Sequence, residues 1–300
     1  MPKWIYPVMI AVGSSCYGIL STNIKLAMNA GFTASEAVTA QYMTGFFLAL
    51  ILFAVINRRL PSLKGAAALI PAGVFTAATG IVYGKSLVYL PASLAVVLLF
   101  QFTWIGMLID CIARKRLPNR AEVISLVLLF MGTVLAAGLI GTDLTGIPWQ
   151  GWAWGMAAAL TFSLFIFSNR KTVEGMDTLT RLLITSFVAA VIISIFQSPE
   201  ILWNGSLTDG LWMYGLLLGV FGIIAPVVLF GMAVPHVGSG LSSILSSTEL
   251  PVAVTVSVLL LHEPFSGVQL VGIIVILIGM IVPSLFERRR SATPIVTESP

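Results

Sequence analysis

The sequence predicts an all-α integral membrane protein in which ten transmembrane helices form two inverted five-helix repeats, with both termini in the cytoplasm. Three observations predict this fold class. The first is composition, since 58% of the 300 residues are hydrophobic and only 9% are charged, whereas a typical soluble chain carries about 25% charged residues. The second is a series of long apolar stretches, and the third is the uneven distribution of lysine and arginine along the chain.

The composition also excludes several functional classes. A soluble enzyme and a disordered chain both need more polar residues than this chain has, and a disulfide-stabilised secreted domain needs more cysteines. The two cysteines, Cys16 and Cys111, lie in apolar surroundings and form neither a disulfide pattern nor a metal-binding pattern. We therefore expect no metal and no cofactor.

A transmembrane helix needs about 20 mainly apolar residues, because each residue adds about 1.5 Å toward a hydrocarbon core about 30 Å thick. Ten stretches of the chain fit this requirement, and charged or proline-containing segments such as 57–61 and 114–120 separate them. The predicted spans are residues 5–27, 37–57, 66–84, 89–110, 121–141, 149–168, 180–198, 209–231, 237–261 and 266–286.

The basic residues orient these spans. With the N-terminus inside, 14 of the 16 lysines and arginines fall in inside segments, and only Lys25 and Lys85 fall on the other side. Because positive charge collects on the cytoplasmic side of membrane proteins, we predict a multi-pass protein of the inner or plasma membrane with both termini cytoplasmic. The cations behind the net charge of +4 are then anchors at the lipid surface, and we expect membrane lipid rather than nucleic acid as their partner.

The two halves of the chain resemble each other weakly. Residues 232–281 align without gaps over residues 85–134 at an offset of 147, and Tyr17-Gly18 aligns over Phe162-Ser163 at an offset of 145. Five spans per half is an odd number, so the second half must enter the membrane inverted. We predict a first repeat over 1–144, a second over 145–290, and a disordered cytoplasmic tail over 291–300. Inverted repeats are a recurring plan of secondary transporters, with the substrate site near the bilayer midplane.

Four short motifs then resemble those of one family. They are Tyr17-Gly18 followed by Asn23-Ile24-Lys25, then Glu249-Leu250-Pro251, then His262-Glu263-Pro264, and the spacing of Gln269, Gly272 and Gly279. On ten spans with this repeat, they resemble the drug/metabolite transporter superfamily in its ten-span EamA-type family, over residues 5–286. The chain departs from the family pattern at three positions. His262 replaces a usual Gly, Arg116 is the counterpart of Glu263, and Gln41 stands where the second span often carries Arg.

This resemblance implies a transporter that moves a small metabolite by alternating access, often outward, and not an enzyme. It leaves the substrate open among amino acids, drug-like compounds and other metabolites. A monomer and a homodimer are both compatible with it.

Glu249 is the most informative single residue. It lies 12 positions from each end of its predicted span, and therefore near the bilayer centre. A carboxylate at that depth is unfavourable unless it faces a polar cavity or carries a proton. We interpret Glu249 as a substrate-binding residue that also carries the coupling proton. The alternative is a structural acid that is hydrogen-bonded to a neighbouring helix near Pro251.

Seven further residues are candidates for the substrate site. Gln101 lies near the middle of its span, and the repeat places it opposite Thr248, which together with Ser246 belongs to a polar run beside Glu249. The resemblance places the others around the cavity, where aromatic rings would suit an aromatic or quaternary-ammonium ligand through cation–π contact. For every candidate the alternative is packing between helices. The residues that the resemblance adds are Tyr17, Asn23, Tyr83 and Trp104.

The sequence therefore predicts a secondary transporter that exports a small organic metabolite, namely an amino acid, a drug-like compound or a cation, with proton coupling through Glu249. An importer or an uncoupled facilitator is the alternative within transport. An intramembrane enzyme is the alternative from another class, and it would need paired acids or a histidine–metal cluster. The sequence shows one central acid and no such set.

Overall fold

The computed structural model describes residues 2, 4–57, 61, 64–90, 92–136, 146–170, 176–197, 200–261 and 266–292, and these residues form helices and short connections without a strand. Eight helices are long and apolar enough to cross a membrane. They are α1 (Ile5–Asn29), α2 (Ala34–Asn57), α3 with its leading turn (Ala66–Tyr89), α4 with α5 (Leu94–Ala113), α7 (Trp149–Ser168), α8 (Thr178–Gln197), the segment of α9 and α10 (Leu207–Val237), and the segment of α11 and α12 (Ser239–Leu260).

The two remaining predicted spans coincide with two further helices. Helix α6 runs over Arg120–Ala136, where this described range ends, and in α13 (Gly267–Ala292) the apolar stretch found among the described residues is Gly267–Val282. The total of ten spans therefore stays a prediction. The predicted tail begins inside α13, which continues to Ala292, and residues 293–300 lie outside the described residues, as does the motif of residues 262–264.

Two predicted spans that we expected to be continuous are broken in the middle. The span over 89–110 consists of α4 (Ala92–Leu99) and α5 (Phe102–Ala113), joined at Phe100 and Gln101. The span over 237–261 consists of α11 (Ser239–Leu245), a tight turn (Ser246–Thr248) and α12 (Glu249–Leu261). Broken backbone at membrane depth requires other hydrogen-bond partners, and polar side chains supply some of the contacts here. Gln101 Nε2 donates to the Val97 carbonyl at 3.0 Å, and Thr248 Oγ1 donates to the Leu245 carbonyl at 3.4 Å. Thr248 Oγ1 also ties the turn to α1 by donating to the Ala11 carbonyl at 2.8 Å.

The predicted span over 209–231 is also irregular. It contains α9 (Trp212–Gly219) and α10 (Ala225–Val237), with π-helical turns at Leu207–Leu211 and Val220–Ile224. Gly210 has a φ of 109°, which favours glycine, and Pro226 begins the second segment without a backbone N–H. These residues explain why a single straight helix does not form.

Reciprocal hydrogen bonds set the starts of several helices. At the start of α6, the Asn119 backbone N–H donates to Glu122 Oε2 at 2.7 Å, and the Glu122 backbone N–H donates to Asn119 Oδ1 at 2.9 Å. At the start of α13, the Ser266 backbone N–H donates to Gln269 Oε1 at 2.8 Å, and the Gln269 backbone N–H donates to Ser266 Oγ at 3.2 Å. Such capping boxes satisfy N–H groups that a helix start would otherwise leave free. The two pairs are 147 residues apart, which is the offset of the predicted repeat.

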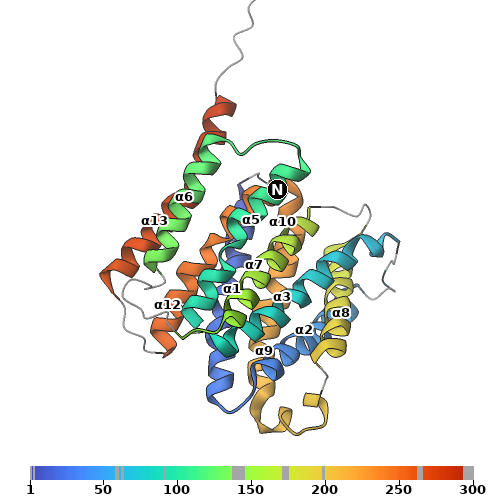
Figure 1. Cartoon of the computed structure of the whole chain (residues 1–300). Coiled ribbons are helices and arrows are strands. Elements are labelled where there is room, and N and C mark those ends of the chain that lie inside the picture. Colours follow the sequence, from blue (N-terminus) through green and yellow to red (C-terminus); the bar gives the residue numbers. More distant parts are fainter. Residues whose placement is uncertain are drawn as a thin grey trace, which may run out of the picture.

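The helices of the two halves pack against one another rather than in two separate groups (Figure 1). Helix α3 packs on α7 as α10 packs on α1, and α2 packs on α9 as α8 packs on α3. Likewise α12 packs on α1 as α5 packs on α7, and α6 pairs with α13 to one side of the bundle. Each pairing has a counterpart in which the halves are exchanged, which is the arrangement that an inverted repeat would produce.

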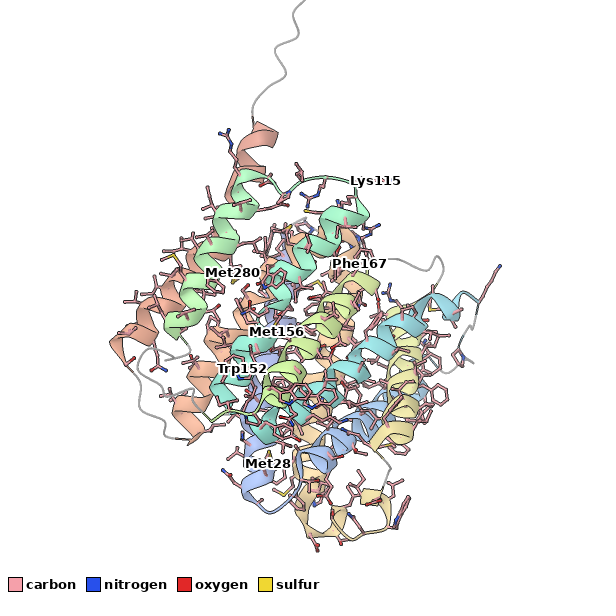
Figure 2. The ribbon with its side chains drawn as sticks, viewed as in Figure 1. Met28, Lys115, Trp152, Met156, Phe167 and Met280 are labelled. Atoms are coloured by element: carbon pink, nitrogen blue, oxygen red, sulfur yellow. The ribbon has the colours of Figure 1, made fainter. Side chains whose placement is uncertain are left out.

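The ends of the helices alternate between two sides of the bundle. The start of α1 and the end of α13 lie at the same end in Figure 1. Lys115, which follows α5, lies at that end, and Met28, near the end of α1, lies at the opposite one (Figure 2). The outer surface is apolar, as on α2, where Phe47, Ile51 and Val55 are more than half exposed at helical spacing. Such a surface suits lipid rather than water.

Candidate functional site

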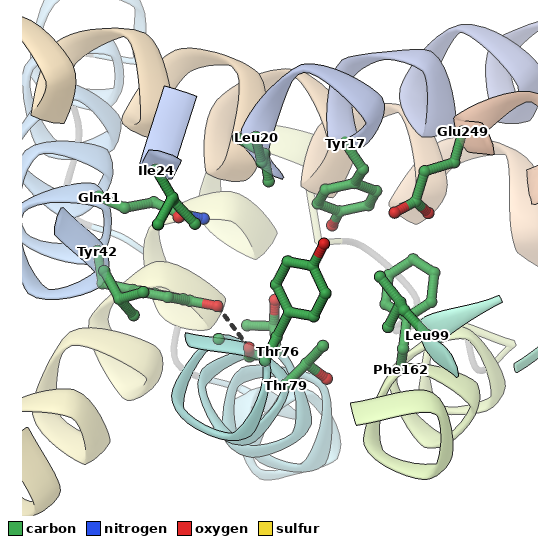
Figure 3. Close-up of a pocket in the computed structure, with 13 residues that line it drawn as sticks. Tyr17, Leu20, Ile24, Gln41, Tyr42, Thr76, Thr79, Leu99, Phe162 and Glu249 are labelled. Atoms are coloured by element: carbon green, nitrogen blue, oxygen red, sulfur yellow. Dashed lines mark hydrogen bonds between the residues drawn. The ribbon is translucent and has the colours of Figure 1, made fainter. Parts of the chain in front are cut away.

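A small central pocket lies where helices of both halves meet. It encloses about 50 Å³, which is far smaller than the 300–1,000 Å³ or so of a typical drug-sized site. Helices α1, α2, α3 and α4 line it from the first half, and α7 and α12 line it from the second (Figure 3). The lining residues are Tyr17, Leu20, Ile24, Val38, Gln41, Tyr42, Thr76, Thr79, Gly80, Tyr83, Leu99, Phe162 and Glu249.

Glu249 reaches this pocket because the chain breaks immediately before it. It is the first residue of α12, after the turn at Ser246–Thr248, and its side chain lies beside the ring of Tyr17 (Figure 3). The residue is 5% exposed, and its Oε2 atom has no hydrogen-bond partner among the described residues. A buried polar atom without a partner is rare in folded proteins. The structure therefore presents a carboxyl oxygen that is available to a ligand or a proton.

Helix α1 approaches Glu249 closely because residue 18 is glycine. A Cβ atom at Gly18 would lie 2.5 Å from the Glu249 carbonyl oxygen and 3.0 Å from the backbone nitrogen of Ala253. Small residues let membrane helices cross at short distance. This crossing brings Tyr17, the residue before Gly18, into the pocket beside the carboxyl group.

Aromatic rings form much of the wall. Tyr17 and Phe162 meet edge to face with ring centres 5.2 Å apart, and Phe162 meets Phe102 in the same way at 4.7 Å. The Tyr42 hydroxyl donates to the Thr76 carbonyl at 2.5 Å, as Figure 3 shows. The Tyr17 hydroxyl oxygen is buried without a hydrogen-bond partner among the described residues. The pocket thus has fixed aromatic walls and two unpartnered oxygen atoms.

The structure brings together only three of the eight residues that we predicted for the site, namely Glu249, Tyr17 and Tyr83. Asn23 Nδ2 donates to the Tyr214 carbonyl at 3.4 Å, and Thr248 bonds to backbone carbonyls, so both are engaged in helix packing. Ser246 is fully buried and lies outside the pocket lining.

Gln101 and Trp104 lie together in a different hollow, between α5 and α6. Trp104 Nε1 donates to Gln101 Oε1 at 2.8 Å, and the Trp104 residue is 42% exposed. The hollow encloses about 270 Å³, and its other lining residues are mainly apolar. The structure therefore separates these two residues from Glu249. They lie at or near the break between α4 and α5, which the predicted repeat pairs with the break before Glu249.

Several lining residues were missed by sequence reasoning. Thr76, Thr79 and Tyr83 recur at helical spacing on one face of α3, and this polar stripe in an apolar span could have indicated a cavity. Gln41 stood out only as a departure from the family pattern. Phe162 carried no polar signal, and only its alignment with Tyr17 could have pointed to it.

A charged cluster at the end of α5 was also missed. Asp110 is 1% exposed, and its Oδ1 atom accepts from Arg114 Nε at 3.0 Å and from Ser239 Oγ of α11 at 2.7 Å. Its Oδ2 atom accepts from Arg116 Nη2 at 2.9 Å, and Arg116 also pairs with Glu122. Hydrogen bonding to Glu122, opposed by partial burial and reinforced by Asp110, raises the pKa of Arg116. This cluster joins the two halves at the end of the bundle where α1 begins.

The fold and the pocket together define a multi-pass helical membrane protein with an internal polar and aromatic site between two structural halves. The model of the EamA-like transporter family matches residues 149–285. This match confirms the resemblance to the drug/metabolite transporter superfamily and identifies the second half of the chain as an EamA-like transporter unit. Proteins of this family are transporters and not enzymes, so the protein functions in membrane transport.

One solved structure gives an independent comparison of the fold. A crystal structure described only as "Crystal structure of protein" aligns with 95% of this chain and 99% of its own, with a TM-score of 0.70 and 17% sequence identity. A likeness at this identity supports the fold alone. No curated protein matches the chain by sequence.

Proposed function

We propose that the protein is a secondary transporter of the cell membrane that exports a small organic metabolite by alternating access, and that Glu249 carries the coupling proton. The observation that carries this proposal is the Glu249 carboxyl group, which is buried in a pocket lined by both halves, with one oxygen unpartnered in the described part of the chain. A carboxylate within a bilayer is functional by default, because it is unfavourable there.

The position of the pocket supports alternating access. Because both halves contribute to its lining, rocking one half against the other would open it to one side of the membrane at a time. The broken helices α4–α5 and α11–α12 lie in the middle of the bundle, where discontinuous helices of transporters form their sites.

Proton coupling follows from the chemistry of one carboxyl group. A protonated Glu249 is neutral and bears no charge for a substrate, whereas the ionised form offers two acceptor oxygens. If a proton and a substrate occupy this group in turn, an inward proton gradient drives the substrate outward. This exchange requires no further ionisable residue in the pocket.

The experiment uses the purified chain in proteoliposomes that contain a pH-sensitive dye. A panel of amino acids, organic amines and neutral drug-like compounds is added under an imposed proton gradient, and each compound is scored by proton flux and by its own movement. We expect coupled exchange of at least one compound by the wild type. Glu249→Gln should abolish the proton flux, whereas Glu200→Gln, which removes an exposed carboxylate outside the pocket, should retain it. Full gradient-driven transport by Glu249→Gln would contradict the proposal.

A further inference from the structure

We propose that the pocket selects a small protonated amine, which binds through N–H donation to Glu249 and Tyr17 and through the faces of the surrounding rings. This inference rests on the proposed function, because it names the substrate class of the same site. It goes beyond that function by excluding neutral, anionic and quaternary ligands.

The charge of the pocket favours a cation. Among the described residues that line the pocket, Glu249 is the only acid, and none is a lysine, arginine or histidine. Lys25 and Lys85, the two lysines predicted on the outer side, do not line the pocket. Lys25 Nζ donates to the Leu87 carbonyl at 3.3 Å, and Lys85 Nζ lies 4.6 Å from the centre of the Trp154 ring. A substrate carboxylate would find no cationic partner in this lining and would meet Glu249, so an anion or an amino acid is disfavoured.

Unpartnered oxygen atoms distinguish a protonated amine from a quaternary ammonium. Glu249 Oε2 and the Tyr17 hydroxyl lack a hydrogen-bond partner among the described residues, and both can accept a hydrogen bond. A protonated amine offers N–H donors to both, whereas a quaternary ammonium offers none. Leaving buried acceptors unsatisfied is unfavourable by about 1–3 kcal/mol for each group. The site is therefore completed by a donor as well as by a positive charge.

The aromatic walls fit the remainder of such a ligand. Tyr17, Tyr42, Tyr83 and Phe162 line the space around the carboxyl group. A cation over an aromatic face gains electrostatic attraction, and the gain is larger where water is excluded. With a volume of about 50 Å³, the pocket suits a small amine with a short apolar chain.

Four probes of similar size test the inference without requiring transport. Binding to the purified full-length chain in detergent is measured by calorimetry at neutral pH for butylamine, butan-1-ol, butyrate and tetramethylammonium. We expect butylamine to bind and the other three to bind at least roughly tenfold more weakly, because each lacks the charge, the correct sign or the N–H donors. Equal affinity for butan-1-ol would overturn the role of charge, and equal affinity for tetramethylammonium would overturn the role of N–H donation. Absence of butylamine binding would overturn the proposal.

Variants locate the binding in this pocket. Glu249→Gln should weaken butylamine binding by roughly tenfold to a hundredfold, as expected for the loss of a hydrogen bond to a charged group. Tyr17→Phe retains the ring but removes the hydroxyl, and it should weaken binding severalfold even if Glu249→Gln fails to fold. The matched control Glu200→Gln should bind like the wild type. Unchanged affinity in both pocket variants would overturn the assignment of the site.

The failure of this inference is distinguishable from the failure of the proposed function. A protein that binds butylamine through Glu249 but moves no compound in proteoliposomes would support the site and contradict transport. Exchange of protons for a neutral or anionic metabolite would support the proposed function and overturn the proposal of an amine substrate.

Discussion

The two broken helices carry their charge in different places. At the offset of 147 residues, the break of α4–α5 at Gln101 corresponds to Thr248, and Phe102 corresponds to Glu249. In the first half, Phe102 is fully buried among aromatic rings, and the acid of the helix, Asp110, lies near its end in an ion-pair cluster. In the second half the acid lies at the break itself and faces the pocket. The acid of the first broken helix therefore joins the two halves at one end of the bundle, whereas the acid of the second lies in the pocket that both halves line.

The helix crossings beside the two breaks differ in a matching way. Ser163 of α7 donates to the Phe102 carbonyl at 3.1 Å, whereas Gly18 of α1 leaves room for the Glu249 carbonyl. Ser163 and Gly18 are the residues that the offset of 145 aligns, and Phe162 and Tyr17, which precede them, meet edge to face across the pocket. One crossing, α7 on α5, thus includes a hydrogen bond, and the other, α1 on α12, is formed by close backbone packing.

The largest effect on stability is expected at Asp110, the anchor between the halves. Asp110→Ala should lower the free energy of unfolding by about 2–3 kcal/mol, because Ser239 and two arginines lose a buried acceptor while the partial exposure of both arginines limits the loss. Chemical denaturation followed by tryptophan fluorescence measures this change. Butylamine affinity should stay within about twofold of wild type, because Asp110 lies outside the pocket.

Arg120→Ala is the control for this variant. It removes an exposed cation close to the same cluster that takes no part in an ion pair within the described residues, so its effect should be within about 0.5 kcal/mol. Equal losses of unfolding free energy in Asp110→Ala and Arg120→Ala would contradict the role of Asp110 as an anchor between the halves.

The next prediction compares the crossing of α1 with α12 and the crossing of α7 with α5 by placing alanine in each. Gly18→Ala should lower the unfolding free energy by about 1–3 kcal/mol, because its Cβ would press on the backbone of α12. Ser163→Ala loses only one hydrogen bond between membrane helices, which averages about 0.6 kcal/mol. The same denaturation assay measures both. A larger loss in Ser163→Ala than in Gly18→Ala would show that the crossings are not used as the structure implies.

The acid at the break should behave opposite to the acid at the helix end. Glu249→Gln removes a buried carboxylate whose Oε2 has no partner in the described structure, so we expect stability to be unchanged or higher by up to about 1 kcal/mol while amine binding is lost. Denaturation and calorimetry on the same preparation measure the two quantities. A loss of more than about 2 kcal/mol would indicate that Glu249 is a structural acid, because functional sites commonly trade stability for activity.

The sequence predicted much of the fold because its signals are large and local. Long apolar stretches located a helix in each predicted span, and the depth of Glu249 within its span singled out an acid that the structure places in the pocket lining. The breaks could not be foreseen in the same way. The apolar pattern continues through Phe100-Gln101 without a signal for a break. Whether the helix breaks at a polar residue depends on contacts with residues that are distant in sequence, such as the contact of Thr248 with Ala11.

Side-chain direction was the second limit on prediction. The alignment of the halves pairs Gln101 with Thr248, and both lie at helix breaks, but a register does not say which way a side chain points. Gln101 turns to Trp104, outside the pocket lined by Glu249, whereas Thr76 and Tyr83 on α3 point into it. Asp110 escaped notice because its partners Arg116 and Ser239 come from other elements, and only the packing of α5 against α11 brings them together.

The smallest effect is expected in the outer hollow and tests whether the first-half break has any part in binding. Trp104→Phe keeps an aromatic ring but removes the N–H that donates to Gln101, so it should lower the unfolding free energy by about 0.5 kcal/mol. Butylamine affinity should not change, because the described structure places neither residue in the pocket of Glu249. Calorimetry on Trp104→Phe and on Gln101→Ala gives the decisive number. A tenfold loss of affinity in either variant would show that both breaks contribute to binding, and the contrast between the two breaks would then fail.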